Sequence, residues 1–364
     1  MFALAFALAV PAAVITSAGA TPVAESPVGY AHVTVPGNTA LRGDPSNQLQ
    51  VVVWYPAPAG TTAIPIVIGP PGSPYFVEGR AAQDAQLAAS PAHMPLIVVS
   101  HGTGGTAMDL SWLCAGLAAA GSIVASVDHA GNNALQPETV AGNTLWWMRA
   151  DDLSRVIDGL LATPRFAPRI DRSRIGAAGF SLGGLTVLML AGARADVSLL
   201  ETYCASKPKT PLCTGESTPE IPDLRTRAQA LAASDPTYRA ALAANSISHR
   251  DARVKAVFSI APALGAAIVP GSLGAIDVPA ALVAGFGDPI LPVGDNAIAD
   301  ALGIPNAELT IFPKPVAHYT FLTACAPAGE RQFAPICGDS GPTRIAVHNA
   351  TVDLARSFFA ANLR

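Results

Sequence analysis

Short, wholly apolar segments alternate with longer segments of helical periodicity along most of this chain. Such runs are typical of strands buried on both faces, and their alternation with helices places them in a mostly parallel sheet. The expected strands cover 48–56, 94–102, 122–131, 173–180, 254–262, 278–288 and 307–313. The expected helices cover 108–120, 146–163, a segment from Leu182, and 344–362. The sequence therefore predicts an α/β fold whose central sheet is flanked by helices.

One stretch, residues 195–250, interrupts this alternation. It contains several prolines and two short helical pieces, "LRTRAQALAAS" and "DPTYRAALAAN". Two interpretations remain open: a cap over the carboxyl edge of the sheet, or a decoration that faces solvent. Because no Gly/Ser linker separates it from the rest, we expect residues 21–364 to form a single domain that carries this insertion.

The N-terminal 20 residues predict export. They contain no charged side chain and end in Ala-Gly-Ala, a pattern similar to a signal-peptide cleavage site. The alternative is a buried N-terminal helix. No later apolar run reaches the ~20 residues of a transmembrane helix, so we expect no stable membrane insertion. The sequence thus predicts a periplasmic or secreted protein.

The cysteines agree with an oxidising compartment. Cys204 lies near Cys213, and Cys325 lies near Cys337, with Pro, Gly and polar residues between the members of each pair. Neither pair has the Cys-x-x-Cys spacing of a zinc site, and no histidine falls between its members, so two disulfides are favoured over metal. Cys114 stands alone and is expected to be a buried thiol.

The charge distribution excludes one class of partner. The 364 residues carry a net charge of −4, and Lys and Arg are scattered along the chain. A nucleic-acid surface needs a concentrated basic face, so we expect no such partner.

A G-x-S-x-G motif, "GFSLG" at 179–183, joins an expected strand to an expected helix. This is the setting in which a nucleophilic serine sits on a tight, strained turn above the sheet edge. The free N–H groups of the following helix then face any negative charge that develops there. Ser181 is therefore the candidate nucleophile.

A serine nucleophile needs a base and an acid that orients the base. Of the downstream histidines, His249 is expected at the surface and His348 inside the last helix, whereas His318 follows the last strand on a loop. Asp288 ends the expected strand at 278–288. Ser181, Asp288 and His318 therefore follow the nucleophile–acid–base order of α/β-hydrolases. The reserve acid is Asp295, seven residues beyond Asp288.

The loop "SHGTGG" (100–105) directly follows a buried strand, and it is expected to supply a backbone donor to an oxyanion. The expected donors are the N–H groups of Thr103 and Leu182. The loop lacks the Lys-Ser/Thr ending of a phosphate-binding loop. His101 precedes the motif serine and is expected to shape this loop.

The segments "SHGTGG", "VDHAGN", "GFSLGG", "GFGDPILP" and "AHYTFL" together resemble the exported bacterial relatives of platelet-activating-factor acetylhydrolase and dienelactone hydrolase. The resemblance covers roughly 28–190 and 250–362. It implies an α/β-hydrolase fold, with Ser181, Asp288 and His318 in the roles given above. Two departures exist. Dienelactone hydrolases use a cysteine nucleophile, and the acetylhydrolases place the acid after an earlier strand, which here ends in "SIAPALG" without an acid.

These inferences together predict a carboxylic-ester hydrolase that works through an acyl-enzyme and needs no metal or organic cofactor. Its substrate is expected to be a small-molecule or polymeric ester. Two alternatives stay open: an amidase or peptidase with the same machinery, and a catalytically silent binding module with a hydrolase fold.

Overall fold

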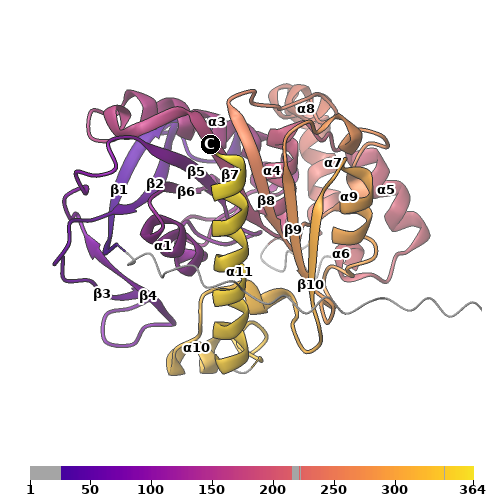
Figure 1. Cartoon of the computed structure of the whole chain (residues 1–364). Helices are drawn as coiled ribbons and strands as arrows, with labels where there is room; N and C mark the ends of the chain where they lie inside the picture. Colours follow the sequence, from indigo (N-terminus) through magenta and orange to yellow (C-terminus); the bar gives the residue numbers. More distant parts are fainter. Residues whose placement is uncertain (1–25, 215–220, 222, 340) are drawn as a thin grey trace, which may run out of the picture.

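The protein is described here by a computed structural model that covers residues 26–214, 221, 223–339 and 341–364. The signal peptide expected at 1–20 lies outside these residues. The strands form a sheet in the spatial order β10-β9-β8-β7-β5-β6-β2-β1-β4-β3 (Figure 1). The strands are β1 (Val28–Pro36), β2 (Gln48–Pro56), β3 (Ile64–Ile68), β4 (Phe76–Gln83), β5 (Met94–Ser100), β6 (Ile123–Asp128), β7 (Ile170–Phe180), β8 (Val254–Ile260), β9 (Ala280–Gly285) and β10 (Glu308–Phe312).

The sheet has a parallel part and a mixed part. Strands β6, β5, β7, β8, β9 and β10 run parallel, as the alternating pattern predicted. On the other side, β2 pairs antiparallel with β6 and β1, and β4 pairs antiparallel with β3. The predicted strands stop a few residues earlier than expected at several carboxyl ends, and the residues beyond them form loops at one edge of the sheet. That edge carries the candidate site.

Helices cover both faces of the sheet. The α-helices are α1 (Ser111–Ala119), α2 (Val140–Thr144), α3 (Met148–Ala162), α4 (Leu182–Ala191), α5 (Val197–Ser206), α6 (Pro211–Thr214), α7 (Leu224–Ser234), α8 (Pro236–Ala243), α9 (Ala297–Gly303), α10 (Pro327–Gln332) and α11 (Gly341–Asn362). Within the described residues, every helix is too short or too polar to cross a membrane.

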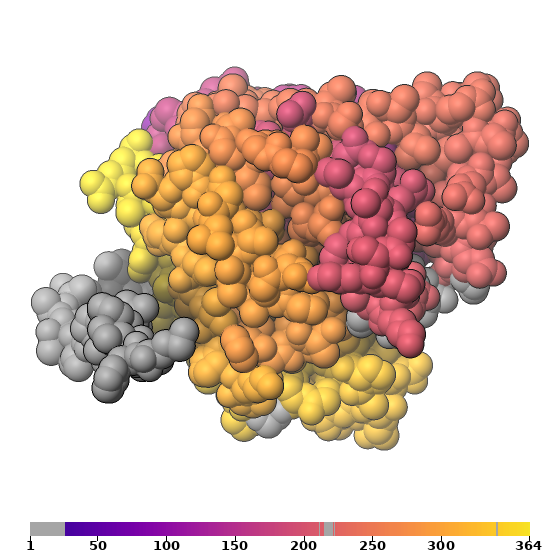
Figure 2. Space-filling view, turned by 90° about the vertical axis from the view of Figure 1, so that its right-hand side faces the viewer, coloured from indigo at the N-terminus to yellow at the C-terminus, as the bar shows by residue number. Residues whose placement is uncertain are grey.

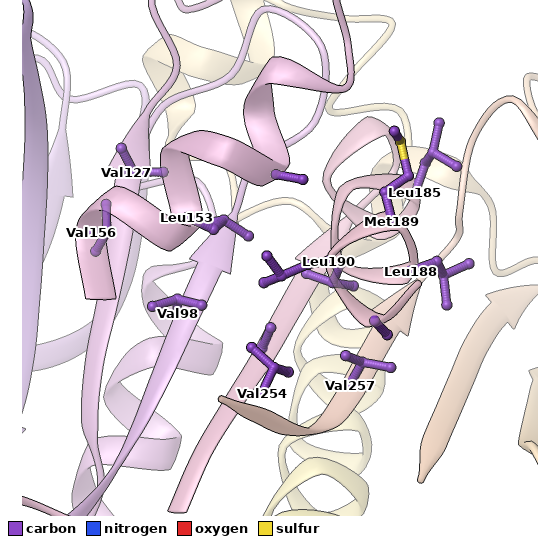
Figure 3. Close-up of a cluster of buried hydrophobic side chains, with 14 of the residues drawn as sticks. Val98, Val127, Leu153, Val156, Leu185, Leu188, Met189, Leu190, Val254 and Val257 are labelled. Atoms are coloured by element: carbon purple, nitrogen blue, oxygen red, sulfur yellow. The ribbon is translucent and has the colours of Figure 1, made fainter. Parts of the chain in front are cut away.

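Two apolar layers enclose the sheet. Leu153 of α3 and Leu188 of α4 pack with Val98 of β5 in one layer (Figure 3). Val99, the next residue of β5, belongs to the opposite layer with Trp112 of α1 and residues of α11. Successive side chains of a strand point to opposite faces, so a strand covered on both sides must be apolar throughout. This explains the uninterrupted apolar runs in the sequence and confirms the α/β fold class.

One helix boundary differs from the expectation. The predicted helix at 108–120 begins at Ser111, because Asp109 does not cap it. The carboxylate of Asp109 instead accepts hydrogen bonds from the N–H and the hydroxyl of Thr106, three residues earlier, and so closes a turn in the preceding loop.

Within its described residues, the insertion at 195–250 contains α5 to α8 and lies alongside the segment that follows β8, as the crimson-to-salmon and orange parts of Figure 2 show. The Tyr238 hydroxyl lies 2.7 Å from the Thr144 hydroxyl of α2. The Lys207 ammonium lies 2.9 Å from the carboxylate of Asp295, on the loop between β9 and α9. The insertion therefore contacts the loop that also carries Asp288.

A buried carboxyl in α9 gives the fold a pH dependence. Asp300 is 1% exposed, and burial raises its pKa to about 7, above the value expected in an unfolded chain. Between about pH 4 and pH 7 the unfolded chain ionises at this residue while the folded form stays protonated, so stability falls as pH rises, by up to about 4 kcal/mol. We expect Asp300→Asn to remove this loss. The difference in melting temperature between the variant and wild type should therefore be more positive at pH 8 than at pH 5.

Thermal melts at both pH values check this expectation. Asp277→Asn is the matched control, because Asp277 is exposed and its pKa is lowered by the hydrogen bond with Arg250. An Asp300→Asn variant whose melting temperature follows wild type at both pH values would contradict the assignment.

Candidate active site

Ser181 lies on the turn between β7 and α4, with φ 56° and ψ −119°. This region of backbone space is strained for a residue with a side chain, and such strain is held only where the surroundings fix the turn. The Ser181 N–H donates to the carbonyl of Ile260 at 2.8 Å, and its carbonyl accepts from the N–H of Ala263 at 3.0 Å. Strand β8 and the loop after it thus hold the serine above the sheet edge.

The two glycines of the motif are required by close packing of the backbone. A Cβ at Gly179 would lie 2.1 Å from the carbonyl oxygen of Gly183, and a Cβ at Gly183 would lie 2.0 Å from that of Ser100. No side chain fits at these distances. The G-x-S-x-G spacing therefore follows from the way α4 starts directly against β5 and β7.

The structure brings together the three residues expected from the sequence. The Ser181 Oγ lies 3.0 Å from Nε2 of His318, and Nδ1 of His318 lies 2.7 Å from Oδ2 of Asp288. All three residues are buried, with exposed fractions of 7%, 4% and 8%, respectively. An imidazole held in this way can accept a proton from the hydroxyl at one nitrogen while its other N–H donates to a carboxylate.

The loops that carry the acid and the histidine support each other. Oδ1 of Asp288 accepts the backbone N–H groups of Ile290 and Leu291 at 2.9 and 2.8 Å, which fixes the carboxylate plane. The N–H of Gly287 donates to the carbonyl of Val316, two residues before His318. A change in either loop would therefore move both members of the pair.

The other histidines and the reserve acid lie elsewhere. Asp295 bonds Lys207 and Tyr203 and is not bonded to His318. The expectation that His249 is a surface residue is wrong: its side chain is 7% exposed and its Nδ1 lies 2.8 Å from a carboxylate oxygen of Asp151. The insertion folds back onto α3 there, a long-range contact that local sequence does not reveal. His348 is buried in α11, as expected.

Of the two expected oxyanion donors, Leu182 directly follows the serine in sequence, and Thr103 lies on a loop that runs beside it. A Cβ at Gly102 would lie 3.3 Å from the Ser181 Cβ, so the loop at 100–105 runs next to the serine. In the part of the chain that the structure describes, the N–H groups of Thr103 and Leu182 have no hydrogen-bond acceptor. Beside this loop, a hollow of about 490 Å³ is lined by Gly104, Asn133, Ala134, Gln136, Pro137 and Glu138.

A second Ser–His–Asp series, which the sequence did not predict, lies under the loop. Ser100 Oγ lies 2.9 Å from Nε2 of His129, and Nδ1 of His129 lies 2.8 Å from Asp152. These residues are at most 1% exposed, so substrate cannot reach them. Burial and the charge of Arg149 lower the pKa of His129 to about 3, while Arg42 outweighs burial and lowers the pKa of Asp152 to about 2. The series is a neutral imidazole between a hydroxyl and a carboxylate.

This buried series is connected to the backbone of the loop. The guanidinium of Arg149 donates to the carbonyl oxygen of His101, to Ser100 Oγ at 3.3 Å and to Asn132 Oδ1 at 2.7 Å. Nε2 of His101 accepts the backbone N–H of His129. Burial lowers the pKa of Arg149 to about 9, and the group is still charged at neutral pH. The network fixes the peptide between His101 and Gly102, next to Thr103, and His101 contributes to the shape of the loop as expected.

Two disulfides are present, Cys204–Cys213 and Cys325–Cys337, and Cys114 is a buried free thiol. The pairing of the four cysteines is that expected from the sequence. Cys325 pairs with Phe76 of β4 in a short antiparallel bridge. The second disulfide thus closes a loop that begins seven residues after His318 and is attached to the sheet.

Removal of that disulfide should affect both stability and turnover. We expect the double variant Cys325→Ser/Cys337→Ser to lose about 2–3 kcal/mol of stability, the cost of freeing a short loop. It should also lose activity, because the position of His318 tolerates little displacement. Thermal melts and kcat measure both effects. Cys204→Ser/Cys213→Ser is the matched control and should lose less activity, so equal losses of kcat in the two variants would contradict this view.

Comparisons with known proteins agree with the architecture. A family model described as platelet-activating factor acetylhydrolase, isoform II, matches residues 77–143, a segment that contains β5, β6 and the loop at 100–105. The curated proteins contain no match. A solved ferulic acid esterase from Streptomyces cinnamoneus is similar with a TM-score of 0.59 and 20% identity, over 95% of this chain and 92% of that chain. The chain has an α/β-hydrolase fold. Residues 77–143 are similar to the acetylhydrolase family model, and Ser181, Asp288 and His318 lie outside that match.

Proposed function

We propose that this protein is a serine hydrolase that cleaves carboxylic esters through an acyl-enzyme. The observation that carries the proposal is the continuous hydrogen-bonded series from Ser181 through His318 to Asp288, with the serine on a strained turn at the start of a helix. This arrangement activates a hydroxyl that is otherwise a weak nucleophile.

Each residue has one role in the proposed reaction. Ser181 Oγ attacks the ester carbonyl while Nε2 of His318 accepts its proton, and the imidazolium then donates that proton to the leaving alcohol. Asp288 holds the Nδ1–H tautomer and stabilises the imidazolium. The N–H groups of Leu182 and Thr103, which have no other acceptor among the described residues, stabilise the oxyanion. Water then hydrolyses the acyl-enzyme by the same steps in reverse order.

Two comparisons favour ester over amide substrates. One similar structure is a ferulic acid esterase, and the family model is named for an acetylhydrolase. The hollow beside the loop at 100–105 is lined by the polar side chains of Asn133, Gln136 and Glu138 among others, and it offers space on the far side of this loop for part of a larger substrate. An amidase or peptidase would use the same three residues, so the leaving group must be tested directly.

The test compares p-nitrophenyl butyrate with the matched p-nitroanilide, together with labelling by a fluorophosphonate probe. We expect rapid turnover of the ester, little turnover of the anilide and a label on the peptide that contains Ser181. Faster cleavage of the anilide would show an amidase, and absence of both turnover and label would show a silent binding module. Acyl chains of increasing length, an aromatic diester and a phospholipid then define the substrate class.

We also propose that the protein is exported. The two disulfides favour an oxidising compartment. N-terminal sequencing of protein recovered from the periplasm or medium should give Thr21 as the first residue, and recovery of an uncleaved chain in the cytoplasm would contradict the proposal.

A further inference from the structure

The short 3₁₀ turn η5 (His318–Phe321) carries the candidate base, and side chains from distant elements hold its backbone. Nε2 of His348, in α11, lies 2.7 Å from the carbonyl oxygen of Thr320. The indole N–H of Trp112, in α1, donates to the carbonyl of Phe321 at 3.2 Å. The position of His318 therefore depends on two side chains that do not touch Ser181 or Asp288.

The two hydrogen bonds of His348 require a proton on Nε2 and a second proton, either on Nδ1 or on Glu78. A carbonyl oxygen only accepts, so Nε2 must carry a proton to bond Thr320. Nδ1 lies 2.7 Å from Oε1 of Glu78, in β4. A neutral imidazole with its proton on Nε2 would turn a lone pair toward an ionised Glu78. The contact is satisfied only when the Glu78–His348 pair holds one more proton, as an imidazolium beside a carboxylate or as an imidazole beside a carboxylic acid.

The surroundings support such a pair. The side chains of His348 and Glu78 are 1% and 10% exposed, so water does not replace a lost hydrogen bond. The imidazole lies flat on the Trp112 indole, with ring centroids 4.1 Å apart and planes 2° apart, a geometry that favours a cationic ring. The other oxygen of Glu78 accepts the N–H of Ala324 at 2.9 Å, in the segment that follows η5.

The nearby charged groups of α11 and its neighbours are already paired. Arg344, one turn before His348, bonds the carboxylate of Asp339 and the carbonyl of Thr323. The carbonyl of Asp109, before α1, accepts the N–H and the hydroxyl of Thr323. Glu78 is therefore the titratable side chain that bonds His348, and both of its oxygens hold the region around η5.

We propose that Glu78 and His348 form a proton-dependent clamp that positions His318 against Ser181. Neither residue touches substrate, so both are positioning residues, and the proposal rests on the proposed esterase function. Loss of the shared proton at high pH leaves two lone pairs facing each other in a buried site. One bond of the clamp then breaks, η5 shifts, and kcat falls reversibly on the alkaline side while KM changes little.

Two variants distinguish the effect of the extra proton from the effect of losing the hydrogen bonds of His348. In Glu78→Gln, the new amide can donate to Nδ1 of a neutral His348 and still accept the N–H of Ala324, so the clamp is complete without the extra proton. We expect this variant to keep kcat at neutral pH within about threefold and to lose the alkaline decrease. His348→Phe removes both bonds, and a displaced base should cost about 10²-fold in kcat at every pH. Glu308→Gln, at an exposed site in β10, is the matched control and should behave as wild type.

Two measurements decide the proposal: pH profiles of kcat and KM for a p-nitrophenyl ester, and ¹⁵N spectra of histidine-labelled protein. The spectra should show Nε2 of His348 protonated, and the Nδ1 signal should change over the same pH range in which kcat falls. An alkaline decrease in Glu78→Gln equal to that of wild type would overturn the proposal, as would wild-type kcat in His348→Phe. If the proposed function is wrong, wild type shows no turnover, whereas the spectra still report the protonation of His348.

Discussion

We expect Ser181→Ala to lower kcat/KM for a p-nitrophenyl ester by at least about 10³-fold, because loss of a triad nucleophile typically removes several orders of magnitude. The variant should also lose all labelling by a fluorophosphonate. Its fold should be unaffected, since Ser181 is held by backbone hydrogen bonds to Ile260 and Ala263 that alanine preserves. The melting temperature should therefore stay within a few degrees of wild type.

Ser259→Ala is the matched control for this variant. Ser259 is a fully buried serine in β8, the strand that holds Ser181, and its hydroxyl has no hydrogen-bond partner among the described residues. Its removal should leave turnover and labelling within a few-fold of wild type. Residual turnover of Ser181→Ala above about 1% of wild type would be inconsistent with a nucleophilic role.

The candidate site was predictable from sequence because parallel strands bring their carboxyl ends to one edge of the sheet. Ser181, Asp288 and His318 each follow a separate apolar run, so their convergence follows from the topology and not from nearness in the chain. The need for the motif glycines was also predictable, because a tight turn between a strand and a helix leaves no room for side chains.

The antiparallel part of the sheet was less predictable. Strand β4, "FVEGRAAQ", contains two charged residues and no continuous apolar run, and β3 is short and largely exposed. Nothing in these segments indicates that Glu78 is turned inward toward His348. That contact joins residues 270 positions apart. It depends on where α11 lies relative to β4, which the local sequence does not reveal.

The buried network under the loop at 100–105 could not be predicted for a similar reason. Arg149 and Asp152 lie three residues apart in an amphipathic helix, where charged residues usually form the solvated face. Asp152 forms a bidentate pair at 2.7 Å with Arg42, which lies 110 residues earlier in the chain. Periodicity identifies the helix but not the inward direction of these charges.

Asp288→Asn should lower kcat by about 10²- to 10⁴-fold, the range expected when a triad histidine is held in the wrong tautomer. We expect a loss of kcat because the hydrogen bonds of this carboxylate fix the orientation of the asparagine amide that replaces it. Oδ1 accepts the N–H groups of Ile290 and Leu291, so the asparagine carbonyl must take that position and its NH₂ group must face Nδ1 of His318. The imidazole then carries its proton on Nε2, toward Ser181 Oγ, where a base is needed. Because the backbone contacts persist, stability should change little.

Asp295→Asn distinguishes this mechanism from a general effect of charge. Asp295 lies seven residues further along the same loop, and its pKa is lowered by hydrogen bonds with Lys207 and Tyr203 of the insertion. The pair with Lys207 is about half exposed and contributes little to stability. We therefore expect less than about a threefold change in kcat for this variant, since it leaves the tautomer of His318 untouched. Equal losses in the two variants would place the acid elsewhere. A large loss of kcat for Asp288→Asn alone would show that Asp288, the carboxylate that bonds His318, controls the tautomer of this histidine.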